Sequence, residues 1–249
     1  MGGSWIFLSH SSKDIQIVRK IRNEFEACGH NPLAFHLKCL NSDTEEGKKE
    51  IFELLKREID AREWYVFCES EHSEKSAYVN YERDYILGSG KSKIWSLDVT
   101  KEWNVLKKQI DKISKDLRIF VEYNDSDQDT VKPLIELLEH NDFTVWTNEN
   151  DCQGEAWEDA LRCGLLIMII SKNTHISALL GELEYITGNI NGGETIVPVF
   201  VEGYSLPQHD EIWLRGGPSF DIPEAADHED YASLLRYIEG IYTHRILKT

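Results

Sequence analysis

The strongest constraint on the fold is a pattern of elements that runs through the chain twice. Each copy begins with a short apolar run that ends in polar residues, Trp5–Ser9 in the first copy and Leu117–Val121 in the second. An amphipathic helix follows in each copy, and further strands then alternate with helices. Such self-similarity predicts two copies of one structural unit. The 249 residues of the chain are enough for two domains of ordinary size.

The predicted elements of the two copies correspond one to one. In the first copy, strands are expected at 5–9, 32–37, 64–68 and 93–99, and helices over 18–28, 46–61, 76–87 and 100–114. In the second copy, strands are expected at 117–121, 143–147, 165–170 and 195–201, and helices over 131–138, 155–163 and 177–187. An edge strand near 219–222 and a helix over 229–246 complete the chain. Strands that alternate with helices predict α/β domains with doubly wound parallel sheets, here 1–115 and 116–249.

Charge is distributed unevenly between the two copies. Through Asp116 the chain has 19 Lys and Arg against 20 Asp and Glu, whereas the remainder has 8 against 24. So acidic a surface repels phosphate backbones, which argues against a nucleic-acid partner.

The longest apolar run, Leu165–Ile170, is far shorter than the roughly 20 residues of a membrane span. Five cysteines without a CxxC pair fit a reducing compartment, so we expect a soluble, cytoplasmic protein without a membrane partner.

The polar segment Ser9–Asp14 follows the first strand. In open α/β sheets, ligands bind beyond the carboxyl ends of the strands. Backbone N–H groups and hydroxyls in such a segment can bind a phosphate or a ribose. The same residues also fit a plain helix N-cap, with Ser11 or Ser12 as the capping residue. Neither GxxxxGK[ST] nor GxGxxG occurs, so the chain has no P-loop and no dinucleotide fingerprint.

A carboxylate interrupts the apolar stripe of the helix after the third strand in both copies. In the first copy, Glu82 lies on the stripe between Val79 and Ile86, and in the second copy Glu182 takes the matching place. Burial of a carboxylate is costly unless the group is paired or used in function. A single residue of this kind is explained by a position at the rim of the core. Its recurrence in both copies favours a functional carboxylate.

These segments resemble signatures of the bacterial type of Toll/interleukin-1 receptor (TIR) domain. Phe7–Asp14 is similar to the family's FxSxxxxD segment, and Ser76–Glu82 is similar to its SxWxxxE helix, with Tyr78 at the position of the Trp. The second copy resembles the family in its middle part, which includes Trp157, and in the strand around Val197–Val199. The resemblance implies a flavodoxin-like fold for both copies.

The resemblance also implies an activity, because many TIR domains cleave NAD+ at the nicotinamide–ribose bond with the helix glutamate as the key residue. Carried over, it implies an NAD+ glycohydrolase or cyclase with Glu82 as the catalytic residue and Glu182 as the second choice. The residues expected to bind the substrate are Ser9, His10, Ser11, Phe35, Ser76 and Tyr78. NAD+ is then the substrate, and we expect no cofactor and no metal. The product stays open between ADP-ribose and a cyclic or base-exchanged compound, and the family suggests a role in antiphage defence or signalling.

The second copy departs from the family pattern at the expected site. Ser177 precedes Glu182 by five residues, whereas six separate Ser76 and Glu82, and the loop Glu122–Asp127 is strongly acidic. Negative charge there repels a pyrophosphate. We therefore expect a single working site, in the first copy, and a degenerate or scaffolding second copy.

Two other functions are alternatives to the enzyme. One is a non-catalytic adaptor that assembles with other TIR proteins, which the Tyr in place of Trp at position 78 favours. Self-association, or association with other TIR or effector proteins, is expected in both cases. The other is a phosphoacceptor receiver domain, which needs acidic residues around the end of the first strand and an Asp after the third. The chain has Ser9-His10 and Glu69-Ser70 at these places, so the receiver function is set aside.

Overall fold

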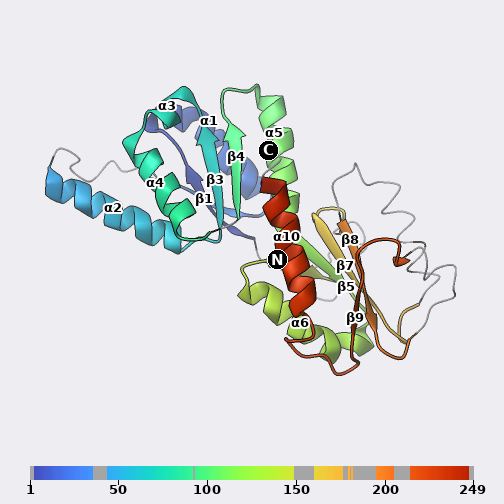
Figure 1. The fold of residues 1–249 in the computed structure, drawn as a ribbon. Coiled ribbons are helices and arrows are strands. Elements are labelled where there is room, and N and C mark those ends of the chain that lie inside the picture. Colours follow the sequence, from blue (N-terminus) through green and yellow to red (C-terminus); the bar gives the residue numbers. More distant parts are fainter. Residues whose placement is uncertain are drawn as a thin grey trace. The chain divides into compact units, whose positions relative to one another are not determined.

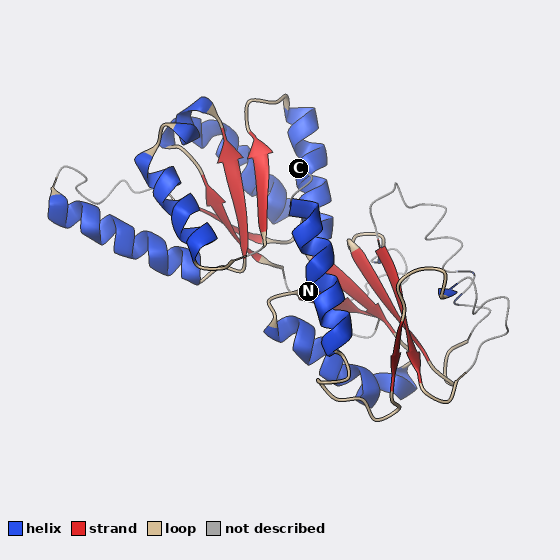
Figure 2. Cartoon of the chain, in the orientation of Figure 1, coloured by secondary structure: helices blue, strands red, loops and turns tan. Residues whose placement is uncertain are grey.

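The computed structural model describes residues 3–35, 44–91, 93–148, 160–175, 179, 181, 195–204 and 214–246. The chain divides into two compact units. The N-terminal unit consists of residues 2–114 together with the end of the chain from Gly240, and the C-terminal unit consists of residues 115–239. In each unit, strands form a central sheet with helices packed against it (Figure 2).

The N-terminal unit contains a four-stranded sheet in the order β2-β1-β3-β4, with all pairs parallel. Its strands are β1 (Trp5–Ser9), β2 (Asn31–Ala34), β3 (Trp64–Glu69) and β4 (Ile94–Asp98). Its helices are α1 (Ile15–Ala27), α2 (Glu45–Asp60), α3 (Glu71–Glu74), α4 (Ala77–Gly88) and α5 (Trp103–Asp116), and a 3₁₀ turn at Ser12–Asp14 precedes α1. The predicted doubly wound parallel sheet is confirmed.

Side-chain alternation along the strands assigns the core residues to two faces of this sheet. One face packs against α2 and α4, which Figure 1 shows on the same side of the sheet. The buried residues of this cluster are Phe7, Ile51, Leu55, Ile59, Tyr65, Phe67, Ile86 and Ile94. Helix α1 buries Val18, Ile21 and Phe25, which lie at helical spacing on one of its faces.

The C-terminal unit repeats this arrangement with one more strand, in the order β6-β5-β7-β8-β9. Its strands are β5 (Arg118–Glu122), β6 (Thr144–Thr147), β7 (Leu165–Ile170), β8 (Thr195–Val201) and β9 (Phe220–Ile222). Its described helices are α6 (Gln128–His140) and the first part of α10 (Ala232–Ile246), whose residues from Gly240 belong to the N-terminal unit, and a 3₁₀ turn at Asp125–Asp127 precedes α6. All six residues of β7 are buried. The predicted edge strand is confirmed as β9, which pairs in parallel with β8.

Some elements differ from the sequence prediction or lie outside the described residues. Helix α3 was not predicted, because four residues are too few to show a periodicity. It forms because Ser70 and Ser73 make a reciprocal capping box at its start. The predicted helix over 155–163 is described only from residue 160 onward, and the predicted helix over 177–187 is described only at residues 179 and 181.

The strand order determines where a ligand site is expected in each unit. In the N-terminal unit the chain moves from β1 outward to β2 and then returns to place β3 on the other side of β1. The order reverses between β1 and β3, and the loops after their carboxyl ends diverge there. Such switch points are where open α/β sheets bind ligands. In the C-terminal unit the equivalent point lies between β5 and β7.

Candidate active site

Two segments far apart in the sequence meet at the switch point of the N-terminal unit. Ser9, at the end of β1, donates a hydrogen bond from its Oγ to Oε2 of Glu82 on α4, at 2.5 Å. The Ser9 side chain points to the same sheet face as Phe7, the face that α4 covers. Both groups are buried, with 1% of Ser9 and 7% of Glu82 exposed. The structure therefore brings the strand-one serine and the helix glutamate into direct contact.

The start of α4 determines which of its residues face the sheet. The Ser76 side chain accepts a hydrogen bond from the backbone N–H of Val79, which caps the helix. From this start, Val79, Glu82 and Ile86 follow one another at helical spacing and are the three buried residues of α4. Ser76 thus positions Glu82 by fixing the first turn of its helix.

Burial changes the protonation of Glu82. Loss of contact with water raises the pKa of this carboxyl to about 7, although the hydrogen bond from Ser9 acts in the opposite direction. At neutral pH, the neutral and the ionised form of Glu82 are therefore both populated. Burial also raises the pKa of the nearby Cys68 thiol to about 12, with a contribution from surrounding carboxylates. Cys68 is thus a neutral thiol at physiological pH and is no candidate nucleophile.

The residue after Glu82 adds a positive charge at the same edge of the sheet. Arg83 donates from Nη2 to Oε1 of Glu69 at 3.2 Å, and its guanidinium carbon lies 4.9 Å from the ring centroid of Phe67. Phe67 is the residue opposite Ser9 in the pairing of β1 with β3. The Glu82–Ser9 pair and the Arg83 guanidinium thus stand beside neighbouring strands. Sequence reasoning missed Arg83, although its position directly after Glu82 was a signal.

The loop after β1 is organised by its own polar side chains. Ser11, rather than Ser12, is the cap of the 3₁₀ turn and accepts a hydrogen bond from the Lys13 N–H at 3.3 Å. Nδ1 of His10 lies 3.0 Å from the carbonyl oxygen of Leu8. Because a carbonyl oxygen only accepts, this contact requires the proton on Nδ1.

The two aromatic residues expected at the site lie on the sheet face that bears α2 and α4. Phe35 and Tyr78 are half-buried and pack against the hydrophobic cluster of that face. The Tyr78 ring lies 5.7 Å from the ring of Phe52 on α2. Both side chains thus supply aromatic surface next to the helix that bears Glu82. The second-choice residue, Glu182, lies outside the described residues, as does Ser177.

An aspartate joins the same two loops in both units. In the N-terminal unit, Ser70 donates to Oδ2 of Asp14 at 2.6 Å. In the C-terminal unit, Ser171 donates to Oδ2 of Asp127 at 2.6 Å, and Asn173 donates to its other oxygen at 2.7 Å. The loop after the first strand is thereby tied to the loop after the third strand in each unit.

The strand-end position that precedes this aspartate by five residues differs between the units. It is occupied by Ser9 in the N-terminal unit and by Glu122 in the C-terminal unit. A hydroxyl at this position in the N-terminal unit is thus replaced by a carboxylate in the C-terminal unit. The equivalent edge of the C-terminal unit therefore has a different chemistry, as the acidic loop predicted.

The described residues contain neither a cluster suited to a metal ion nor a helix suited to a membrane. In the ranges that the structure describes, no three His, Cys, Asp or Glu side chains come together in a way that could hold a metal ion. Of the helices described, none has both the length and the apolar character needed to cross a membrane.

The sequence model of the TIR domain matches the chain twice, over residues 6–114 and over residues 119–235. The two matches cover most of the chain, one in each unit, and each includes the strand-end position and the following aspartate. A search of curated proteins finds no match.

Among solved structures, the chain is similar to a mutant flavo di-iron protein from Thermotoga maritima, with 13% sequence identity and a TM-score of 0.40 over 84% of this chain and 55% of that chain. It is also similar to a flavoprotein from the same organism, with 13% identity and a TM-score of 0.38 over 82% of this chain and 56% of that chain. The chain thus spans little more than half the length of these two structures. At these scores, the two similarities carry no argument about function.

Proposed function

The chain belongs to the TIR domain family, with two TIR units in tandem, and from this premise we propose that its N-terminal unit cleaves NAD+ at the nicotinamide–ribose bond. One observation carries the proposal: a buried carboxyl, Glu82, is held by Ser9 at the switch point where this fold binds ligands. A buried carboxylate at such a point is costly for folding and is typical of a functional site.

The proposed chemistry uses the negative charge of Glu82. When the bond between C1′ of the ribose and the ring nitrogen breaks, its electron pair leaves with nicotinamide, which becomes neutral. Positive charge then develops on the ribose, and an ionised Glu82 held in place beside it stabilises that charge. Water adds at C1′ and releases one proton, so the products are ADP-ribose, nicotinamide and H+. An internal base nitrogen as the acceptor gives a cyclic product instead.

The remaining residues receive roles from their positions. Ser9 keeps the Glu82 carboxylate in one orientation, and the Arg83 guanidinium is assigned to the pyrophosphate, since it presents a positive charge one strand away. His10 and the Ser11 turn are assigned to the ribose or phosphate groups. Tyr78 and Phe35 are assigned to contact with a ring of the substrate.

The test is the release of nicotinamide from NAD+ by the purified full chain, at several protein concentrations, followed by chromatography. Glu82→Gln keeps the size of the side chain and removes the charge, and we expect it to lower the rate at least about a hundredfold. The matched control is Glu50→Gln, the same change at an exposed position of α2. Full activity in Glu82→Gln would refute the site, and chromatography of the product decides between hydrolysis and cyclisation.

A second candidate function is a non-catalytic adaptor that assembles through its TIR units. The low exposure of Glu82, already hydrogen-bonded to Ser9, favours it, because a substrate must displace part of this closed arrangement. This function predicts self-association in light scattering and no nicotinamide at any protein concentration.

The cellular setting follows from the proposed substrate. We assign the protein to the cytoplasm, where NAD+ is abundant and where cysteine thiols remain reduced. We also assign its activity to antiphage defence or signalling, with a second copy of this chain or another TIR or effector protein as the partner.

A further inference from the structure

A hydrogen-bond network of three side chains lies at the carboxyl edge of β3 and β4 in the N-terminal unit. Oε1 of Glu69, the last residue of β3, accepts hydrogen bonds from Nη2 of Arg83 at 3.2 Å and from Oγ of Ser96 at 3.0 Å. Ser96 lies on β4 and pairs with Phe67 of β3. The network thus joins two neighbouring strands to α4, the helix that bears Glu82.

Glu69 is the fixed member of this network. Its backbone is held at the end of its strand, because it pairs with Asp98 and its carbonyl oxygen accepts a hydrogen bond from the N–H of Val99. The hydrogen bond from Ser96 then orients its carboxylate. The side chain of Arg83 has many rotamers to lose, so it depends on such a fixed partner for a defined position.

Contacts on two sides hold the guanidinium of Arg83. The Glu69 carboxylate accepts from Nη2, and the ring centroid of Phe67 lies 4.9 Å from the guanidinium carbon. Because Nε is buried, a ligand has to bind through Nη1 or the second N–H of Nη2. The Arg83 side chain is 37% exposed, so a ligand can approach it. A guanidinium held in this way presents the paired donors that phosphate oxygens accept.

The C-terminal unit has apolar residues at the three corresponding positions. The correspondence follows from features that both units share, namely the serine of each loop tie, the pairing of the third and fourth strands, and the repeated glutamate. The places of Glu69, Ser96 and Arg83 are taken by Ile170, Pro198 and Leu183. Apolar side chains neither donate nor accept hydrogen bonds. The whole network is therefore a property of the N-terminal unit.

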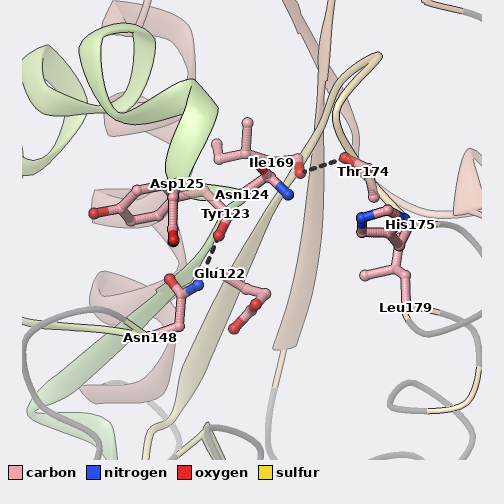
Figure 3. Close-up of a pocket in the computed structure, with 9 residues that line it drawn as sticks. All are labelled: Glu122, Tyr123, Asn124, Asp125, Asn148, Ile169, Thr174, His175 and Leu179. Atoms are coloured by element: carbon pink, nitrogen blue, oxygen red, sulfur yellow. Dashed lines mark hydrogen bonds between the residues drawn. The ribbon is translucent and has the colours of Figure 1, made fainter.

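The equivalent edge of the C-terminal unit also has the wrong charge for a phosphate. Figure 3 shows a pocket there, with the carboxylates of Glu122 and Asp125 among its lining residues. None of the nine residues labelled in Figure 3 is an arginine or a lysine. Carboxylates repel a diphosphate. A group that recognises phosphate is thus expected at the edge that bears Arg83.

We propose that Glu69 and Ser96 are positioning residues that hold the Arg83 guanidinium in place for the diphosphate of a dinucleotide substrate. Because the guanidinium is ordered before the ligand arrives, binding costs less conformational entropy. The Glu69 carboxylate itself repels a diphosphate, so its contribution is geometric rather than electrostatic. This inference rests on the proposed function for the identity of the substrate.

The first test separates geometry from charge with two variants that lose the same charge. Glu69→Gln keeps an oxygen that accepts from Arg83 and Ser96, whereas Glu69→Ala removes the acceptor. We expect calorimetric titration of the full chain with ADP-ribose to give a dissociation constant no higher than that of the parent in Glu69→Gln, and about three- to tenfold higher in Glu69→Ala. Glu50→Ala, at an exposed position of α2, is the control and should not weaken binding. Equal constants in the two Glu69 variants, or no binding of ADP-ribose by the parent, overturn the proposal.

The second test asks whether the two positioning residues act through Arg83. Arg83→Ala is expected to weaken ADP-ribose binding at least about tenfold. In that background Glu69→Ala should cause no further weakening, because there is no guanidinium left to position. Ser96→Ala should weaken binding less than Glu69→Ala does, and only while Arg83 is present. Weakening by Glu69→Ala that is equal with and without Arg83 refutes the positioning role, and unchanged binding in Ser96→Ala refutes the part assigned to Ser96.

Kinetics of NAD+ cleavage separate this inference from the proposed function. In Glu69→Ala the KM for NAD+ should rise while kcat stays within about twofold, since the diphosphate takes no part in the bond that breaks. Nicotinamide riboside has no diphosphate, and its cleavage should be the same in the variant and the parent. Cleavage that requires Glu82 but has an unchanged KM in Glu69→Ala refutes the inference and leaves the proposed function standing. The expected pattern of ADP-ribose binding without any cleavage of NAD+ supports the positioning role and refutes the proposed function.

Discussion

At the scale of single residues, the burial of Glu82 that suits the proposed function also lowers the stability of the protein at neutral and alkaline pH. Its pKa in the folded chain is about 7, above its ordinary value of 4.5, because the carboxyl is buried. Between these two values the folded state binds more protons than the unfolded state. The stability contributed by this group is therefore greatest below pH 4.5 and is lost as the pH rises through 7.

Replacement of Glu82 by Gln is accordingly expected to stabilise the protein at alkaline pH. At pH 8 the free energy of unfolding should increase by up to about 3 kcal/mol, because Gln carries no charge to desolvate and still accepts the Ser9 hydrogen bond. At pH 4 the difference should almost vanish. Thermal unfolding at the two pH values measures this effect, with the exposed Glu50→Gln as the control. If the variant is less stable than the parent at pH 8, interactions within the folded protein offset the cost of burying the ionised carboxylate.

The pH dependence of NAD+ cleavage belongs to the same residue. If ionised Glu82 is required, the rate of nicotinamide release should rise with pH, with a midpoint near 7. The Ser9 hydrogen bond lowers the pKa of Glu82, so Ser9→Ala should move this midpoint to higher pH. A pH–rate profile measures the shift, and the exposed Ser12→Ala should leave the midpoint in place. An unchanged midpoint in Ser9→Ala would show that the fall in rate at low pH does not come from protonation of Glu82.

At the scale of elements, the tie between the first and third loops is formed by a buried aspartate. Asp127 has 6% of its surface exposed and accepts hydrogen bonds from Ser171 and Asn173. Asp127→Ala leaves both donors without this partner, and we expect a loss of about 2–3 kcal/mol in the free energy of unfolding, measured by urea denaturation. Glu139→Ala, at an exposed position, is expected to change stability by less than about 0.5 kcal/mol. Similar values for the two variants would contradict a structural role for the tie.

The helices and strands differ in how well they could be predicted from the sequence. The strands and the helices α1, α2, α4 and α6 were predictable because their buried residues recur at fixed spacing. Helix α3 and the two 3₁₀ turns were not, since local caps rather than periodicity produce them.

Side-chain partners were harder to predict than elements. The repeated glutamate indicated a candidate site, but the hydrogen bond between Ser9 and Glu82 joins residues 73 apart and depends on strand register and helix rotation together. The contacts of Arg83 with Phe67 and Glu69 likewise depend on packing between elements. No pattern in the sequence specifies such distances.

At the scale of the whole molecule, net charge should govern assembly. The formal charge of −17 makes copies of the chain repel one another, and salt screens this repulsion. Self-association, if it occurs as proposed, should therefore increase between about 50 mM and about 500 mM salt. Light scattering at constant protein concentration measures this. Assembly that weakens with salt would instead indicate contacts between opposite charges.

The Asp14–Ser70 and Asp127–Ser171 ties have a consequence for how such a protein can diversify. Each tie anchors its loops without help from the position at the end of the first strand. The residue at that position, Ser9 in one unit and Glu122 in the other, can therefore change without a change in the backbone around it. A duplicated chain can thus acquire a new specificity by point mutation, with its architecture already secured.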